Sequence, residues 1–183
     1  SRPELREATA QTLTRAEVYL PHLRRIFEKG GLPSSLALLP VIESDFHRTA
    51  RGSQDDLGLW QFRDATARDL GLVINERHDE RLHPYRATRA AVRHLRQLQK
   101  HYKSWPLALA AYNAGQRRVD RALERRPGAT FWDLADKGQL PATTREYVPR
   151  FLAVVRVVEG VELCGSRGHM PRVQTDKVET ARP

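Results

Sequence analysis

The spacing of apolar residues predicts helices along almost the whole chain. Near the start, five apolar residues recur at intervals of three and four, the period of one buried helical face: Leu13, Ala16, Leu20, Leu23 and Phe27. Two consecutive glycines follow and are expected to end this helix. The pattern therefore predicts a long N-terminal amphipathic helix.

Three more helices are predicted in the second half of the chain. An apolar stripe runs through residues 84–102. Ser104 and Pro106 then have the residue types of a helix cap and a first turn, and they begin a second helix that stops near Gly115. A short helix is expected at residues 116–125. Each of these segments lies between residues that favour turns or helix ends.

Other segments are expected to interrupt or end this helical pattern. Pro40 lies inside the apolar run 36–42 and should kink or shorten it. Residues 45–60 are rich in Gly, Ser and Asp, so we expect a loop there. Thr143 and Glu146 have the spacing of a capping box, which predicts the start of a last helix.

The expected fold class is all-α. No internal repeat is found, and no alternating apolar–polar run is long enough to require a sheet. We expect an N-terminal helix at residues 1–28, packed on a main domain at residues 29–164. Residues 165–183 are polar and lack periodicity, which predicts a flexible tail.

The charge of the chain suggests an anionic partner. Lys and Arg number 31 against 22 Asp and Glu, which gives a net charge of +9. Such a balance fits a cell-wall polymer, a nucleic acid or a lipid surface. The densest basic segment, residues 117–126, has no interleaved aromatic residues, so a solvated helix face is favoured over nucleic-acid binding.

Several classes of protein and site are disfavoured. Cys164 is the only cysteine, so an internal disulfide and a multi-cysteine zinc site are excluded. His78 and His83 are five apart and would not share a helix face, so we expect no metal site and no cofactor. No apolar run reaches membrane-spanning length. The first residues do not form a signal peptide, so an export signal has been removed, lies outside this sequence, or never existed.

Glu43 is the first candidate for chemistry. It directly follows an apolar run, so its carboxyl group is expected to be partly desolvated, and desolvation raises a carboxyl pKa. A carboxylic acid that keeps its proton near neutral pH is suited to general-acid cleavage of a glycosidic bond. Taken alone, Glu43 is better interpreted as a surface residue that ends a helix, because structural sites also perturb carboxyl groups.

Two later segments place polar and aromatic residues together at expected helix ends or turns. Gln61, Tyr112 and Asn113 offer hydrogen-bonding groups of the kind that sugar recognition needs. Trp60, Tyr112 and Tyr147 offer flat rings that could pack on a sugar. Trp60 has a competing interpretation as a partly buried core residue, and its position beside Gln61 favours the groove.

Four motifs in order carry a resemblance to a known family. They are Glu-Ser at 43–44, Gly-Leu-Trp-Gln at 58–61, Ala-Tyr-Asn-Ala-Gly at 111–115 and Thr-Arg-Glu-Tyr-Val-Pro at 144–149. Together they resemble the lytic transglycosylase (SLT) domain of glycoside hydrolase family 23, over roughly residues 29–158. The resemblance implies a lysozyme-like, mainly helical fold that acts on peptidoglycan glycan strands in the bacterial periplasm or cell envelope, with association to the outer membrane allowed. Nucleic acid and an integral membrane span are not expected, and the oligomeric state is left open.

The resemblance also implies roles for individual residues. Glu43 matches the catalytic acid/base, Ser44 the residue that supports it, and Tyr147 a tyrosine near the catalytic Glu. The implied reaction cleaves the β-1,4 bond between N-acetylmuramic acid and N-acetylglucosamine and closes the C6 hydroxyl onto C1, giving a 1,6-anhydro end. The expected substrate-binding set is Ser44, Trp60, Gln61, Tyr112, Asn113 and Tyr147.

One departure from the family motif leaves alternatives open. Thr143 stands where the family usually has Glu, which affects the expected shape of the active site. A muramidase would hydrolyse the same bond, with Asp55 or Asp56 positioning a water molecule. A non-catalytic peptidoglycan-binding scaffold with the same fold is the third hypothesis.

Overall fold

Helices make up the regular structure of the protein, as the sequence predicts. The computed structural model describes residues 2–160, with side chains described from residue 11 onwards. Within residues 2–160 there is no β-strand, and only three isolated β-bridges occur. The elements in chain order are α1 (Arg2–Lys29), η1 (Ser34–Leu38), α2 (Leu39–Glu43), α3 (Asp64–Asp69), η2 (Glu80–Leu82), α4 (Pro84–Tyr102), α5 (Trp105–Ala114), α6 (Gln116–Arg125), α7 (Phe131–Asp136) and α8 (Ala142–Glu159).

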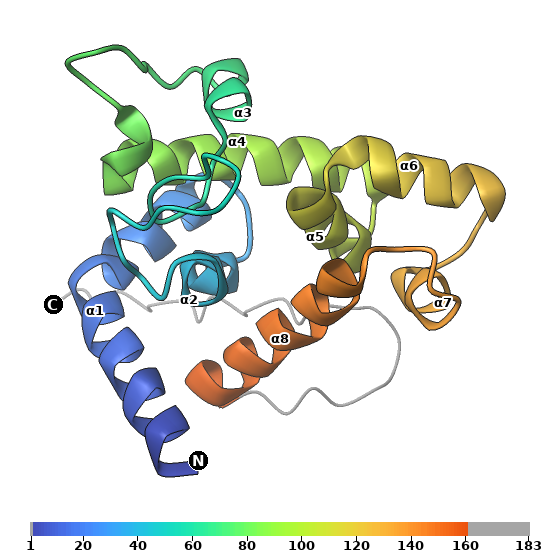
Figure 1. The fold of residues 1–183 in the computed structure, drawn as a ribbon, viewed down its shortest axis with the longest axis horizontal. Helices are drawn as coiled ribbons and strands as arrows, with labels where there is room; N and C mark the ends of the chain where they lie inside the picture. Colours follow the sequence, from blue (N-terminus) through green and yellow to red (C-terminus); the bar gives the residue numbers. More distant parts are fainter. Residues whose placement is uncertain (1, 161–183) are drawn as a thin grey trace, which may run out of the picture.

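Helix α5 lies at the centre of the arrangement (Figure 1). It packs against α4, α6, α7 and α8, and seven of its residues are buried. A helix that is apolar on all sides is expected to be enclosed by its neighbours. Three of its buried residues, Ala108, Ala110 and Ala111, are small enough to let the surrounding helices approach closely. The long helix α1 packs on η1 and α4 and closes the other side of the core through Leu23 and Phe27.

The predicted helices agree with the structure at most positions. The spans predicted at 84–102 and 116–125 match α4 and α6. Pro40 shortens its apolar run as expected, because the run divides into the 3-10 helix η1 and the short helix α2, with Pro40 in the first turn of α2. The short helix α7 was not predicted. The tail expected at residues 165–183 lies outside the described residues.

The capping box predicted at Thr143 is wrong. Helix α8 begins at Ala142 after Pro141, and no side chain caps it. Thr143 is thus already inside the helix, because the fixed backbone of Pro141 sets the helix start two residues earlier than the polar pattern suggests. The structure instead has a capping box in α7, where Thr130 and Asp133 exchange hydrogen bonds.

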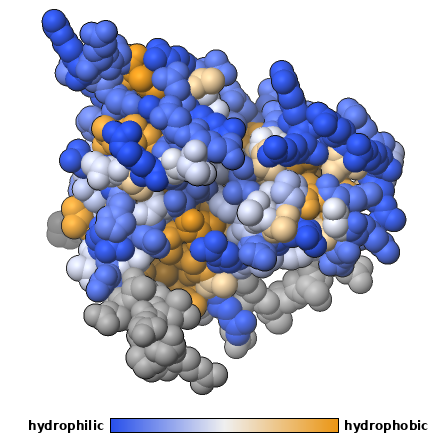
Figure 2. Space-filling model, viewed as in Figure 1, coloured by the Kyte–Doolittle hydropathy of each residue, from blue (hydrophilic) through white to orange (hydrophobic). Residues whose placement is uncertain are grey.

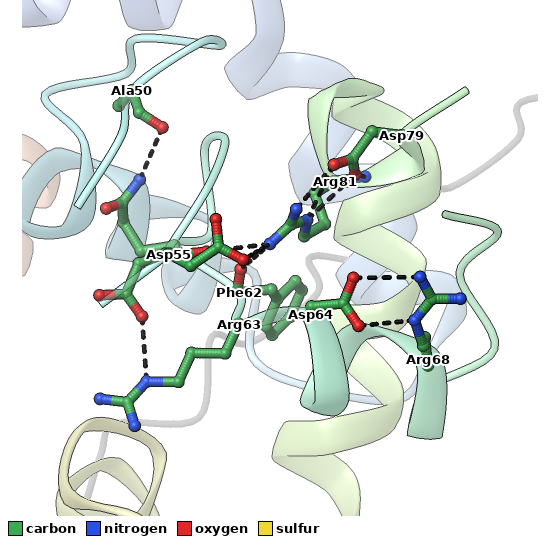
Figure 3. A network of polar contacts seen from close by, with 10 residues as sticks. Ala50, Asp55, Phe62, Arg63, Asp64, Arg68, Asp79 and Arg81 are labelled. Carbon is green, nitrogen blue, oxygen red and sulfur yellow. Dashed lines mark hydrogen bonds and ion pairs between the residues drawn. The ribbon is translucent and has the colours of Figure 1, made fainter. Parts of the chain in front are cut away.

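The irregular segment between α2 and α3 is held by a buried arginine. Arg81 is only 6% exposed, and its guanidinium donates to the carboxylate of Asp79 and to the backbone carbonyls of Asp55 and Phe62 (Figure 3). The ion pair with Asp79 satisfies the buried charge, as burial requires. Arg81 therefore joins the turn before α4 to two points of the 44–63 loop.

The histidine-rich segment at residues 78–83 is occupied by structural contacts. Asp79 pairs with Arg81, and Glu80 pairs with Arg86 and accepts the backbone N–H of Val73. Among the described side chains, no group of three or more His, Cys, Asp or Glu residues could hold a metal ion. None of the described helices is long and apolar enough to cross a bilayer.

The face of the molecule seen in Figure 2 is mostly hydrophilic, and apolar residues show through mainly near its middle. The large hydrophobic side chains that are well exposed in the described region are three scattered valines, Val18, Val73 and Val157. Scattered single residues of this kind are normal on a soluble surface.

A substitution at Gly58 tests how tightly the 44–63 loop is fixed. Its φ is +81°, and a Cβ added there would lie 2.2 Å from the carbonyl oxygen of Arg81. We expect Gly58→Ala to lower the free energy of unfolding by about 3 kcal/mol, because it combines a left-handed backbone with a main-chain clash. Gly128→Ala is the matched control, since its φ is +79° and nothing lies within 4 Å of the added atom. Gly128→Ala should lower the free energy of unfolding by only about 1–2 kcal/mol. Equal decreases in the free energy of unfolding of the two variants, measured with urea, would contradict this account.

Candidate active site

Glu43 is the last residue of α2, and the residues after it hold this helix end in place. The backbone N–H groups of Ser44 and Phe46 both donate to the carbonyl of Pro40. The Ser44 hydroxyl donates to the carbonyl of Leu59 at 3.0 Å and lies 3.3 Å from the Pro40 carbonyl oxygen. The end of α2 is therefore tied to the 44–63 loop.

The assignment of Ser44 to the substrate-binding set is corrected by this arrangement. Ser44 is 8% exposed and is not among the residues that line the cleft. Its hydroxyl is bonded to the main chain, where it supports the position of the neighbouring Glu43.

The carboxyl group of Glu43 is partly buried and is held by a tyrosine from the opposite end of the chain. Tyr147 of α8 donates a hydrogen bond of 2.5 Å from its hydroxyl to Oε1 of Glu43. Burial raises the pKa of Glu43 to about 7. The hydrogen bond from Tyr147 and the charge of Arg150 lower this pKa, whereas the charge of Asp56 raises it, but burial is the largest effect. Glu43 is thus present in both protonated and ionised forms near neutral pH.

Tyr147 is a partner of Glu43 and is not part of the cleft wall. The residue is 6% exposed and is absent from the lining of the cleft. The expected proximity to Glu43 is confirmed, whereas direct contact of Tyr147 with substrate is not supported. Burial raises the pKa of its phenol well above the ordinary value, so it remains a hydrogen-bond donor.

Glu43 opens onto a cleft of about 500 Å³. Three of the predicted substrate-binding residues line it together with Glu43, namely Gln61, Tyr112 and Asn113. Concave sites with a few convergent polar groups are the usual places for ligands. Thr143, the position at which the sequence departs from the family motif, also lines this cleft. Further lining residues that sequence reasoning did not identify include Arg63, Thr66, His94, Gln116 and Arg118.

Tyr112 joins helix α5 to the loop. Its hydroxyl donates to the backbone carbonyl of Trp60 at 2.9 Å, and its ring lies near those of Phe62 and His94. Burial, followed by the charge of Glu43, raises the pKa of Tyr112 well above the ordinary phenol value. Tyr112 therefore remains protonated and keeps the wall of the cleft in a fixed position.

Gln61 and Asn113 each form hydrogen bonds within the site through one end of the side-chain amide. The side-chain nitrogen of Gln61 donates to the carbonyls of Gly58 and Ala50 across the loop, and Gln61 adopts a φ of +47°, which is uncommon for a residue other than glycine. The side-chain oxygen of Asn113 accepts from the buried hydroxyl of Thr144 at 2.8 Å. The amide nitrogen of Asn113 is left to face a ligand.

The prediction that Trp60 lies in the substrate groove is wrong. Its side chain is fully buried, its ring packs on Phe27 with centroids 5.6 Å apart, and its Nε1 donates to Thr88. The tight turn from Gly58 to Gln61 directs the indole into the core, while the neighbouring Gln61 faces the cleft. Trp60 contributes to the site only through its backbone carbonyl, which accepts the hydroxyl of Tyr112.

His94 is a lining residue of the cleft that sequence reasoning missed. It lies three residues after Ala91 and seven after Ala87, so it shares their helix face. A lone histidine on such a face is usually a core residue, and sequence reasoning offers no signal that this position reaches a cleft.

Comparisons with known proteins agree on one family. The family model described as "Transglycosylase SLT domain" matches residues 25–134. The chain is 33% identical over 158 residues to membrane-bound lytic murein transglycosylase D of Escherichia coli strain K12, covering 84% of this chain and 34% of the relative. It is 33% identical over 117 residues to peptidoglycan transglycosylase gp16 of Escherichia phage T7, covering 62% of this chain and 8% of the relative. The chain thus spans about a third of the first relative's length.

A solved structure supports the fold. The lytic transglycosylase Slt from Pseudomonas aeruginosa, determined as an inactive mutant, superposes with a TM-score of 0.63 at 26% identity, covering 74% of this chain and 23% of that one. The predicted all-α, lysozyme-like fold is confirmed. Because the family model covers more than half of the chain and includes Glu43, Gln61, Tyr112 and Asn113, the chain belongs to the transglycosylase SLT domain family.

Proposed function

We propose that this domain is a peptidoglycan lytic transglycosylase, with Glu43 as its acid/base. It cleaves the β-1,4 bond between N-acetylmuramic acid and N-acetylglucosamine and forms 1,6-anhydro ends. The observation that carries this proposal is a carboxyl group with a pKa of about 7, bonded to a buried tyrosine and lining a cleft. The relatives named as murein or peptidoglycan transglycosylases support the same reaction. Membership of glycoside hydrolase family 23 and a location in the bacterial periplasm or cell envelope belong to this proposal.

The reaction uses Glu43 first as an acid. Its proton passes to the glycosidic oxygen as the bond to C1 of the muramic sugar breaks, and positive charge develops on that sugar. Burial favours the protonated form from which this step starts. The carboxylate that results is stabilised by the hydrogen bond from Tyr147 and by the charge of Arg150.

In the second step, Glu43 acts as a base. The carboxylate takes the proton of the C6 hydroxyl of the same sugar as O6 bonds to C1, which returns Glu43 to its starting form. A general acid/base works best when its pKa lies near the working pH, and a value of about 7 suits both steps. The nucleophile is tethered to the reacting centre, which gives it a large effective concentration.

One observation favours the hydrolytic alternative as a second candidate. Asp56 lines the same cleft as Glu43, and its charge contributes to the raised pKa of Glu43, whereas Asp55 does not line the cleft. Hydrolysis with inversion would use Asp56 as the base for a water molecule. Asp56 is paired with Arg63 at 3.2 Å, so its carboxylate already has a partner in the protein. The transglycosylase reaction is therefore the better supported of the two.

Replacement of Glu43 tests the catalytic assignment. We expect Glu43→Gln to lower the release of soluble muropeptides from purified sacculi by at least about 1,000-fold, because the amide can neither give nor take the proton. Glu146→Gln is the matched control on the exposed surface of α8 and should retain activity. Release by Glu43→Gln at the level of the unmodified protein would show that the assignment is wrong.

The raised pKa of Glu43 also predicts a dependence of stability on pH. The folded-state pKa of about 7 exceeds the ordinary value of 4.5, so the folded protein holds this proton more tightly than the unfolded chain. The resulting stabilisation is fully present below pH 4.5 and is lost as pH rises to about 7. Glu43→Gln lacks this titrating group and does not lose stability in this way. The difference between its melting temperature and that of the unmodified protein should therefore shift in favour of Glu43→Gln between pH 4.5 and pH 7.5. A difference that does not change with pH would contradict the burial of this carboxyl group.

Tyr147→Phe separates the effect of the hydrogen bond from that of burial. The bond from Tyr147 lowers the pKa of Glu43, so its loss should raise that pKa further. The alkaline limb of the pH profile of kcat/KM is therefore expected to move to higher pH, with a lower maximum because the carboxylate is less stabilised. Tyr102→Phe, which removes a hydroxyl bonded to Asp120, is the control and should leave the limb unchanged. A limb that stays in place or moves to lower pH in Tyr147→Phe would count against a role for this bond.

A further inference from the structure

We propose that His94 is a substrate-positioning residue of the cleft, which binds a sugar unit next to the cleaved bond by donating from one imidazole nitrogen and accepting at the other. This inference rests on the proposed function and adds a residue that neither the family motifs nor the apolar pattern identifies.

The position of His94 combines a packed ring with a polar edge. It lies on α4, lines the cleft and is partly buried. Its ring packs on that of Tyr112, with centroids 5.5 Å apart and planes tilted by 46°. This contact restricts how the imidazole ring can turn and favours one arrangement of its nitrogens.

These nitrogens have no partner in the described part of the protein. Other polar groups around the cleft are bonded to protein atoms, including the Gln61 amide nitrogen, the Asn113 oxygen and the Tyr112 hydroxyl. No hydrogen bond joins His94 to any described residue, and its nitrogens are not among the fully buried polar atoms that lack a partner. The nitrogens are therefore accessible, and a ligand in the cleft can bond to them.

The protonation state fits a neutral ligand such as a sugar. Burial lowers the pKa of His94 to about 4, so the imidazole is uncharged over the neutral range. A neutral imidazole offers one N–H donor and one acceptor. This pair complements a sugar hydroxyl or an acetamido group, each of which can also donate and accept. Because the imidazole is uncharged, His94 does not favour an anionic ligand such as a carboxylate over a neutral sugar group.

Tyr112 is the neighbour that His94 and Glu43 share. The charge of Glu43 acts on Tyr112, and the ring of His94, from α4, packs on Tyr112. His94 is not among the groups that shift the pKa of Glu43. Thr66 of α3 and Gln116 of α6 line the same cleft. We therefore assign His94 to a sugar subsite beside Glu43 and not to the proton transfers themselves.

The test compares two substitutions at His94 in a protein that binds without turnover. The probe is a soluble, uncrosslinked glycan of alternating N-acetylglucosamine and N-acetylmuramic acid, titrated calorimetrically into Glu43→Gln and into Glu43→Gln combined with His94→Phe. Phenylalanine keeps the ring packing on Tyr112 and removes both nitrogens. We expect glycan affinity to fall about tenfold, as the loss of one or two hydrogen bonds implies. His94→Gln in the same background should recover part of the affinity, because its amide also donates and accepts.

A matched control is available elsewhere on the chain. His22 packs on Tyr85 with centroids 5.6 Å apart and planes tilted by 49°, and it does not line the cleft. His22→Phe therefore makes the same chemical change in a similar ring pair and should leave affinity unchanged. In the active background, His94→Phe is expected to raise KM about tenfold while kcat changes by less than about threefold, which a general loss of structure would not produce.

The outcomes separate this inference from the proposed function. Unchanged affinity in His94→Phe, or an equal loss in His22→Phe, would overturn the role of His94 while leaving the proposed function intact. A loss in kcat with no change in KM would also overturn it. If the Glu43→Gln protein binds no glycan and the unmodified protein releases no product from sacculi, the proposed function itself is wrong. Where His94→Phe does not fold, as judged by its melting curve, His94→Leu provides the same comparison.

Discussion

The hydrogen bond between Tyr147 and Glu43 is the interaction on which the rest of the site depends. It joins residues 104 positions apart, at the end of α2 and within α8, at 2.5 Å. Burial alone would leave the Glu43 carboxyl neutral and a poor base, whereas full exposure would leave it ionised and a poor acid. The buried phenol of Tyr147 moderates the effect of burial, so that the pKa of Glu43 stands at about 7. A single carboxyl group can then serve in both directions of proton transfer.

The same site requires an irregular loop to be as well fixed as a helix. Residues 44–63 gain their order because side chains of the loop itself and of other elements donate to the carbonyl groups of this loop. Ser44 reaches Leu59 within the loop, Tyr112 reaches Trp60 from α5, and the buried Arg81 reaches two further carbonyls. Buried backbone groups need such partners, and here they also determine which side chains face the cleft.

The sequence predicted the helical fold from local patterns, whereas the catalytic role of Glu43 was predicted only from four family motifs in order. The stripe of α4 and the apolar run before Glu43 are readable at the period of a helix. Trp60 could not be placed in the same way, since the turn after Gly58 decides which side chain enters the core. Thr143 has capping-box spacing, but Pro141 fixes the helix start elsewhere. His94 carries no signal at all, because only the packing of α4 against α5 brings it to the cleft.

The central claim is that Glu43 regains its proton from the C6 hydroxyl of the sugar, which then closes on C1, and not from an attacking water molecule. Digestion of purified sacculi in water enriched in ¹⁸O, followed by mass spectrometry of the released muropeptides, tests this claim most directly. The account predicts 1,6-anhydromuramic ends that contain no ¹⁸O. Reducing muramic ends that carry one ¹⁸O atom at C1 from the earliest time points would contradict it and would identify the protein as a hydrolase.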